Sequence, residues 1–535
     1  MVVVSKKILW GTIAVALSTA TTLAQAKNTL VYCSEGSPAG FDSAQYSAGT
    51  DFDVAANNVF DGLMRFPRGE TKAVPALAES YEVSDDGLTY TFHLRKGVKW
   101  HTTKYFKPTR DFNADDVVFT FDRLANKNNP FNKAYPVEFP YYSDMSLDTT
   151  IKSVEKVDDY TVKFVLNNVD AAFIQTMAMP ITTINSKEYA DKLLAEGKAD
   201  LINQQPIGTG PFIFERYQKD ASIRYKANKQ YWNKEDMPLV NNLVFAITKD
   251  AAVRYQKLKA GECDIMSYPL PADIEGMKQD KAIQVLSNPG FNIGFIAYNT
   301  EKSPLDKVEV RQALDFAINK PAIISAVYGG QGQLAVNPMP VTQWSYNKNI
   351  QSRTQDLEKA KSLLAKAGYP DGFSATLWSL PVQRPYNPNG RLMAEMLQSD
   401  WAKIGVKVNI TTFEWGEYLK RARTGEHQIV MSGWTGDNGD PDNWVGNLFG
   451  CNAIGGSNYS RFCYKPFQDL LDQAKKLTDV GERTKLYEKA QEIFFEQTPA
   501  SIIGTSVVNV PVRKEVSGFK ISPLGAFQFT GVSVK

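Results

Sequence analysis

The residues of this chain that could do chemistry do not form a catalytic set. The sequence has no G-x-x-x-x-G-K-[ST], G-x-S-x-G or H-E-x-x-H motif, and no G-x-G-x-x-G after a predicted strand. The glycine-rich segment Gly208-Thr-Gly-Pro-Phe212 lacks a following lysine that could bind a phosphate, which favours a structural turn. The acidic pairs Asp85-Asp86 and Asp115-Asp116 lie beside a turn or in the first turn of a predicted helix, where solvation and the helix dipole account for them. No enzyme activity is predicted.

Two charged residues in loops are suited to gripping a small charged ligand. Arg384 stands between Gln383 and Pro385, and Asp437 lies in the glycine-rich segment Gly433-Trp-Thr-Gly-Asp-Asn-Gly-Asp-Pro-Asp-Asn443. An arginine binds a carboxylate through two parallel hydrogen bonds, and an aspartate in an open turn can accept from an ammonium group. Each has a simpler interpretation, because a loop arginine is usually solvated and aspartate stabilises turns locally. Asp440 and Asp442 are interpreted as turn or hinge residues.

The cysteines predict disulfides rather than a metal site. The chain has four cysteines, Cys33, Cys263, Cys451 and Cys463, and an even count in an exported protein indicates two bridges with three possible connectivities. Pairing Cys451 with Cys463 and Cys33 with Cys263 is the most economical, because the first bridge closes the loop from Asn452 to Phe462. Since no CxxC occurs and the chain has only three histidines, we expect neither a metal nor another cofactor.

The N-terminus predicts export. Lys6 and Lys7 precede the apolar run Ile8 to Leu17, and Ala24-Gln25-Ala26 fits a signal-peptidase site, so residues 1–26 are interpreted as a signal peptide. The run is too short for an ordinary membrane span. Without the two lysines the 60 basic residues become 58, equal to the 58 acidic ones. We therefore expect a periplasmic, soluble protein without affinity for nucleic acid.

The chain length and the pattern of predicted helices and strands indicate a two-lobed α/β protein. About 510 residues are too many for one core, and helix–Gly–strand units occur at Leu357–Phe373 and Leu392–Val406. A helix is also predicted from Asn113 to Arg123, and a hairpin pairing Tyr90–Leu94 with Val98–Trp100. Candidate crossovers near Pro289-Gly290 and Gly504-Thr505 would form a hinge and leave a ligand cleft between the lobes. The expected division is lobe I at 27–289 plus 506–535 and lobe II at 290–505.

Five segments in order resemble the extracellular solute-binding proteins of the peptide/nickel class. They are Pro75–Ser80, Tyr90–His101, Phe112–Val117, Pro206–Phe212 and Val308–Leu314. The resemblance covers essentially the whole mature chain. It implies a periplasmic binding protein of the Venus flytrap type (type II) with an extra domain, about 60–205, inserted in lobe I. It also implies delivery of ligand to an inner-membrane ABC permease.

Four further segments resemble the dipeptide-binding members of that family. They are Tyr32–Ser37, Pro381–Asn389, Phe413–Lys420 and Gly433–Asn443. The resemblance implies the following ligand-binding residues: Asp437 for the α-ammonium, Arg384 for the α-carboxylate, and Trp415, Trp434, Tyr386 and Gly436 around the ligand. It implies the pairing Cys33–Cys263 and Cys451–Cys463 as well.

A zwitterionic dipeptide suits such a site, because each of its buried charges needs a partner. Two fixed charges at opposite ends would also measure ligand length. Relatives of this kind bind haem or glutathione, so haem stays a possible partner. A secreted peptidase and a chaperone-like binder of unfolded chains are the alternatives from other classes. A monomer is expected, since a hinge-bending binder must close freely.

Overall fold

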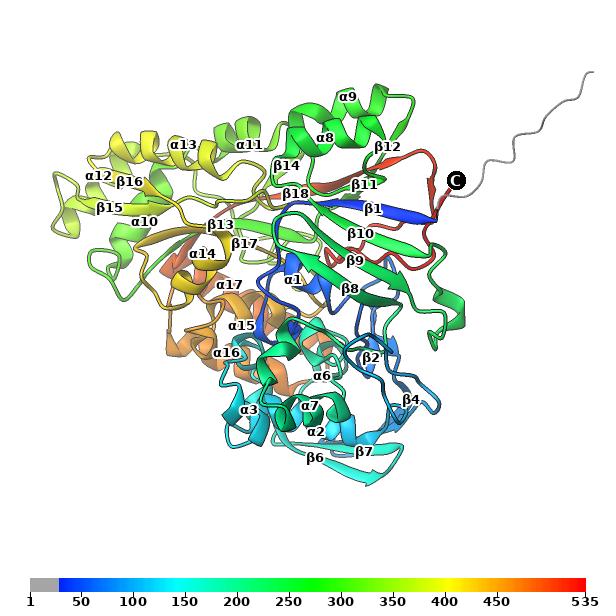
Figure 1. Cartoon of the computed structure of the whole chain (residues 1–535). Coiled ribbons are helices and arrows are strands. Elements are labelled where there is room, and N and C mark those ends of the chain that lie inside the picture. Colours follow the sequence, from blue (N-terminus) through cyan, green and yellow to red (C-terminus); the bar gives the residue numbers. More distant parts are fainter. Residues whose placement is uncertain (1–27) are drawn as a thin grey trace, which may run out of the picture.

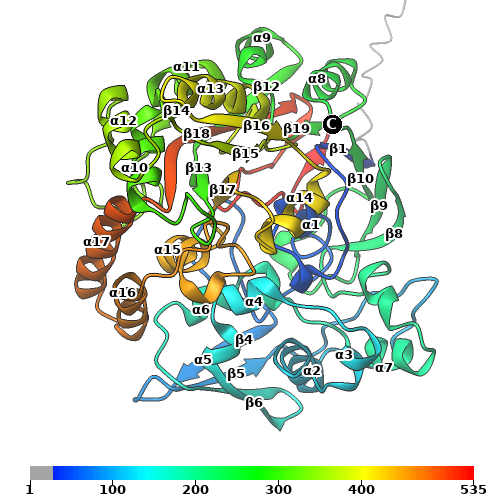
Figure 2. The same cartoon turned by 90° about the vertical axis from the view of Figure 1, so that its left-hand side faces the viewer.

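The computed structural model describes residues 28–535, and the segment interpreted as a signal peptide lies outside them. None of the described helices is long and apolar enough to span a membrane. The chain forms two α/β lobes with a third, smaller body packed beneath them (Figures 1 and 2). This confirms the predicted fold class.

The lobe I sheet is built mainly from the first half of the chain. Its order is β8-β9-β10-β1-β11-β18, and β12 also pairs with β18. The strands are β1 (Thr29–Ser34), β8 (Phe212–Gln218), β9 (Ser222–Ala227), β10 (Asn242–Ile247), β11 (Ile265–Met266) and β12 (Ile283–Pro289). Its helices include α1 (Gly49–Val54), α8 (Ala251–Ala260) and α9 (Ile274–Gln279). A disulfide joins Cys33 on β1 to Cys263 just before β11.

Lobe II has its own sheet and core. The sheet order is β16-β15-β17-β13-β18, and β14 also pairs with β18. All seven residues of β13 are buried, as expected for a central strand covered on both faces. The strands are β13 (Asn292–Tyr298), β14 (Gly332–Leu334), β15 (Ser374–Trp378), β16 (Lys407–Thr411) and β17 (Ile429–Thr435). The helices are α10 (Val308–Ala317), α11 (Lys320–Tyr328), α12 (Leu357–Lys366), α13 (Gly390–Ala402), α14 (Trp415–Arg423), α15 (Asp442–Phe449), α16 (Lys465–Lys476) and α17 (Val480–Gln497).

The two predicted helix–Gly–strand units of lobe II are confirmed. Each helix is followed within three residues by a glycine with positive φ, Gly368 after α12 and Gly405 after α13. The strands that follow, β15 and β16, pair in parallel. The second disulfide, Cys451–Cys463, closes the loop after α15.

One long strand, β18 (Ala500–Arg513), belongs to both lobes. Its first half pairs with β13 and its second half with β12, as Ile296 opposite Ser501 and Val285 opposite Pro511 show. The short link between β12 and β13 is a second crossing. We propose these two crossings, at 289/290 and 505/506, as the hinge; the segments on either side are called lobe I and lobe II below.

Much of the chain between β1 and β8 forms a smaller body, which has a separate hydrophobic core. Its sheet has the order β4-β5-β7-β6, with β4 (Ala78–Val83), β5 (Thr89–Leu94), β6 (Ile151–Asp158) and β7 (Thr161–Leu166). Its helices are α2 (Ala114–Ala125), α3 (Pro130–Ala134), α4 (Pro140–Asp144), α5 (Leu147–Thr150), α6 (Phe173–Thr176) and α7 (Lys187–Ala195). We propose that it is the inserted subdomain.

Of the two elements predicted in this subdomain, the helix is present and the hairpin is not. Helix α2 is confirmed, and Asn113 forms a capping box with Asp116. The predicted hairpin is wrong, because both edges of β5 are occupied by β4 and β7. Val98 and Trp100 are buried in the subdomain core outside any strand.

Candidate functional site

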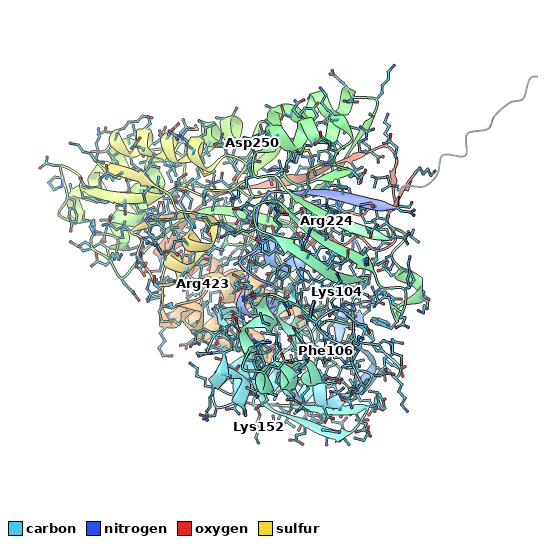
Figure 3. The ribbon with its side chains drawn as sticks, viewed as in Figure 1. Lys104, Phe106, Lys152, Arg224, Asp250 and Arg423 are labelled. Carbon is cyan, nitrogen blue, oxygen red and sulfur yellow. A yellow bond between two sulfur atoms is a disulfide. The ribbon has the colours of Figure 1, made fainter. Side chains whose placement is uncertain are left out.

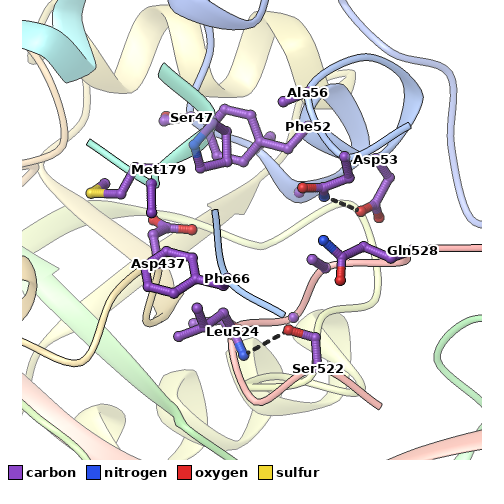
Figure 4. A pocket seen from close by; sticks show the side chains of 18 of the residues that line it. Ser47, Phe52, Asp53, Ala56, Phe66, Met179, Asp437, Ser522, Leu524 and Gln528 are labelled. Carbon is purple, nitrogen blue, oxygen red and sulfur yellow. Dashed lines mark hydrogen bonds between the residues drawn. The ribbon is translucent and has the colours of Figure 1, made fainter. Parts of the chain in front are cut away.

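A cavity lies between the lobes, and all three bodies line it. Its volume is about 180 Å³, whereas one buried water needs roughly 10–15 Å³ on the same measure. Lobe I contributes Phe52 and Asp53 from α1, Ala56 just after it, and the C-terminal stretch from Ser522 to Thr530; Figure 4 shows several of these residues opposite Met179 and Asp437. The subdomain contributes Met179 and Pro180, and lobe II contributes Arg384–Tyr386, Trp415, Gly433–Thr435 and Asp437. The cavity therefore has room for a ligand much larger than a water molecule.

Positive charge is scarce around this cavity. Two cationic side chains of the described chain line it, Arg65 and Arg384. Other cationic side chains, such as Lys152 and Arg224, lie on the outer surface of the protein (Figure 3). Arg65 lies 3.9 Å from Asp236, and Arg384 lies 2.8 Å from Glu35.

Asp437 is a carboxylate without a cation. Its side chain accepts a hydrogen bond from the hydroxyl of Tyr141 on α4, and its backbone N–H donates to Asn443 Oδ1 at 2.9 Å. Within residues 28–535 no lysine or arginine pairs with it. Burial raises its pKa to about 7, and the Tyr141 hydrogen bond opposes that shift. One side of Asp437 is open to the cavity.

The other two aspartates of the same turn are paired with cations. Asp440 lies 2.8 Å from Arg483, and Asp442 lies 2.9 Å from Lys475. Both also support the turn through backbone contacts, since the Asp442 N–H donates to Asp440 Oδ1. Their predicted role as turn residues fits these contacts. The contrast singles out Asp437.

Arg384 reaches across the cleft. Its Nη1 donates to Glu35 Oε1 at 2.8 Å, and both residues are buried. Glu35 follows β1 of lobe I and also accepts from Ser267 at 2.9 Å. The guanidinium lies 4.6 Å from the ring centre of Trp415. Its Nη2 is buried and has no hydrogen-bond partner, which is costly unless a ligand supplies one.

The predicted aromatic residues surround the same space. Trp415, Trp434 and Tyr386 all line the cavity. Trp434 packs edge-on against Tyr141 with ring centres 5.5 Å apart. Tyr386 lies close to Gly433, where a Cβ would come within 2.1 Å of its ring, so strand β17 needs a glycine at that point.

Gly436 is placed differently from the other candidates. It does not line the cavity, although it directly precedes Asp437 in the same turn. A Cβ at this position would lie 2.5 Å from the Phe291 ring and 2.7 Å from Trp444. Its contribution is therefore to close packing of the turn.

Four residues of the site were not found by sequence reasoning. They are Glu35, Asp53, Tyr141 and Asn443. Glu35 directly follows a buried strand, which is the one local signal that could have identified it. The partners of Tyr141 and Glu35 are 296 and 349 residues away, so local patterns carry no trace of these contacts.

A cavity between two α/β lobes that share one long strand, with a carboxylate lacking a cation and an arginine in its walls, defines a ligand-binding protein of the periplasmic type. The chain belongs to the bacterial extracellular solute-binding proteins, family 5, whose middle region matches residues 72–456.

Relatives of known name cover nearly the whole chain. A di/tripeptide-binding protein of Pseudomonas aeruginosa is 59% identical over 99% of both chains. The haem-binding protein A of Haemophilus influenzae is 49% identical over 97% of this chain and 94% of its own. The crystal structure of a dipeptide-binding protein from a Pseudoalteromonas species in complex with Met-Leu is 38% identical. It superposes with a TM-score of 0.91, covering 95% of this chain and 100% of the other.

Proposed function

We propose that this protein is the solute-binding component of an ABC importer that takes up dipeptides. It binds the free dipeptide in the interlobe cavity and delivers it to an inner-membrane permease. It acts in the periplasm after export and catalyses no reaction. The observation that carries the proposal is Asp437, a carboxylate that opens into the cavity and has no cation among the described residues, while its neighbours Asp440 and Asp442 have one each.

The α-ammonium of the ligand binds Asp437. An ammonium placed there supplies the missing positive charge and lowers the cost of burying the carboxylate. Tyr141 and Asn443 hold the turn in place, because Asn443 donates to the Tyr141 hydroxyl at 3.0 Å and accepts from the Asp437 N–H. The carboxylate is thereby oriented before the ligand arrives.

The α-carboxylate of the ligand binds Arg384. Glu35 occupies one arm of the guanidinium, and the buried Nη2 is left for the ligand. Two fixed charges on separate walls favour a ligand with both a free amine and a free carboxylate. Trp415, Trp434 and Tyr386 provide apolar surface between them, which suits side chains of many kinds.

Haem has less support as the ligand, although one relative is named for it. The three histidines of the chain, His93, His101 and His427, all lie outside the cavity wall. His101 and His427 are buried, with their Nε2 atoms 2.8 and 2.7 Å from backbone carbonyls. They are therefore engaged within the protein.

A calorimetric titration of ligand-stripped protein tests the proposal. Dialanine should bind tightly, whereas N-acetyl-dialanine, which has no α-ammonium, should bind far more weakly. Equal binding of both would contradict the role given to Asp437. Absence of binding by either would contradict dipeptide uptake.

A further inference from the structure

A second carboxylate opens into the cavity from lobe I. Asp53 on α1 is 5% exposed and lines the cavity wall. Its Oδ1 accepts from the Phe527 N–H and from Asn57 Nδ2, each at 2.8 Å. Within residues 28–535 no donor reaches Oδ2, and no cation pairs with Asp53. Burial above all raises its pKa, and Glu35 raises it further.

The other acidic residues of the wall are satisfied within the protein, apart from Asp437. Asp61 accepts from Thr209 at 2.7 Å, from Trp232 at 2.9 Å and from Tyr231 at 3.1 Å. Asp236 pairs with Arg68 at 2.9 Å. Asp53 thus has an acceptor to offer a ligand.

Asp53 lies on the Arg384 side of the cavity. Both Glu35 and Arg384 act on the pKa of Asp53: Glu35 raises it and Arg384 lowers it. Figure 4 shows Asp53 and Asp437 on opposite sides, with the side chain of Gln528 beside Asp53. In the described chain the Gln528 amide makes no hydrogen bond, and it lines the cavity too.

The charges at this end do not balance when a neutral dipeptide binds. Glu35 and Asp53 are acidic, Arg384 and the buried Arg254 are basic, and the ligand carboxylate adds a further negative charge, which favours the protonated form of Asp53 unless a cation lies beside it. Buried like charges are costly unless a cation joins them. A positive side chain on the second residue of the ligand would restore the balance.

We propose that Asp53 and Gln528 form a side-chain subsite that prefers lysine or arginine at the second position of the bound dipeptide. Asp53 Oδ2 and the Gln528 amide oxygen accept hydrogen bonds from the ligand cation. This inference rests on the proposed function, since it places the ligand carboxylate at Arg384.

Calorimetry with matched peptides tests the subsite. Ala-Lys should bind the wild-type protein about tenfold tighter than Ala-norleucine, which lacks only the side-chain ammonium, since a hydrogen bond to a charged group is worth about 1.5–3 kcal/mol. Lys-Ala should show no such gain, because its side chain is at the other end. Equal binding of Ala-Lys and Ala-norleucine overturns the subsite without any mutant.

Two single-residue variants test whether Asp53 is the source of the preference for Ala-Lys. Asp53→Asn keeps the acceptor for Phe527 and Asn57 and should bring the affinities for Ala-Lys and Ala-norleucine together. Dialanine should bind at least as tightly as to the wild-type protein, because the variant removes a negative charge near the ligand carboxylate. Asp51→Asn is the matched control: Asp51 is buried on the same helix but does not line the cavity, so the preference should persist. A preference that survives in Asp53→Asn, or an equal loss of dialanine binding there, overturns the assignment. Failure of dialanine to bind the wild-type protein would instead contradict the proposed function.

Discussion

At the scale of single residues, a missing cation distinguishes a binding carboxylate from a structural one. Asp437→Asn should weaken dialanine binding by about 2–5 kcal/mol, because the ligand ammonium would be buried without a counter-charge. Stability should not fall, since the carboxylate has no cation to lose. Calorimetry and urea unfolding measure the two effects.

Asp440→Asn is the matched control for that variant. It breaks a buried ion pair with Arg483, so it should lower the free energy of unfolding by about 3 kcal/mol or more. Its effect on affinity should be the smaller one. A reversed pattern, with affinity lost in Asp440→Asn and kept in Asp437→Asn, would contradict the assignment.

The protonation of Asp437 predicts a pH dependence of binding. Burial raises its pKa to about 7 in the ligand-free protein, so at pH 5 the carboxyl carries a proton. A ligand ammonium favours the charged form, and that proton must leave on binding. Affinity for dialanine should therefore rise from pH 5 to pH 7 and fall again above about 8, where the ligand amine loses its own proton. Titrations in buffers of different ionisation enthalpy should detect proton release, and Asp437→Asn should abolish the rise.

At the scale of elements, the turn after β17 depends on close packing by one of its glycines. A Cβ on Gly436 would lie 2.5 Å from Phe291, whereas a Cβ on Gly439 would meet nothing nearer than 3.8 Å. Gly436→Ala should cost about 1–3 kcal/mol of stability and weaken ligand binding by displacing Asp437. Gly439→Ala should leave both almost unchanged. Thermal unfolding and calorimetry compare the variants, and equal behaviour would show that the turn tolerates displacement.

Elements with local signals could be predicted from the sequence. The helix capped by Asn113 and the glycines after α12 and α13 specify their ends within a few residues, and the structure has them there. The strand predicted at Val98–Trp100 is wrong, because an alternating apolar pattern also fits buried coil. The pattern also gives no information on which strands pair with β5, and these are β4 and β7.

The candidate site residues were proposed from a family resemblance in distinctive loops, whereas residues joined to them only by tertiary contacts gave no such signal. Arg384 and Asp437 are in unusual segments rich in proline or glycine, and both reach the cavity. The contacts Arg384–Glu35 and Tyr141–Asp437 join residues hundreds of positions apart. Only the closed arrangement of lobes and subdomain brings them together.

At the scale of the whole molecule, a few polar contacts join the two sides of the cleft. Arg384 pairs with Glu35 at 2.8 Å, and Arg254 Nη2 donates to Gln383 at 2.9 Å. The subdomain also contacts lobe II, where the Ser457 N–H donates to Asp144 Oδ2 at 2.8 Å. We propose that these contacts form as the lobes close on the ligand, so that affinity depends on how readily they form.

Gly456 tests that coupling without touching the ligand. A Cβ at this position would lie 1.8 Å from Asp144 Oδ1, so Gly456→Ala should push the subdomain away from lobe II. Overpacking of about 1–3 kcal/mol would reduce dialanine affinity by roughly tenfold. Small-angle X-ray scattering should show less compaction on adding ligand than in the wild-type protein. Gly276→Ala on α9, whose new Cβ would lie 3.5 Å from Tyr255, is the control and should close normally. Wild-type compaction and affinity in Gly456→Ala would mean that the Asp144 contact plays no part in closure, leaving the lobe I–lobe II contacts to hold the ligand.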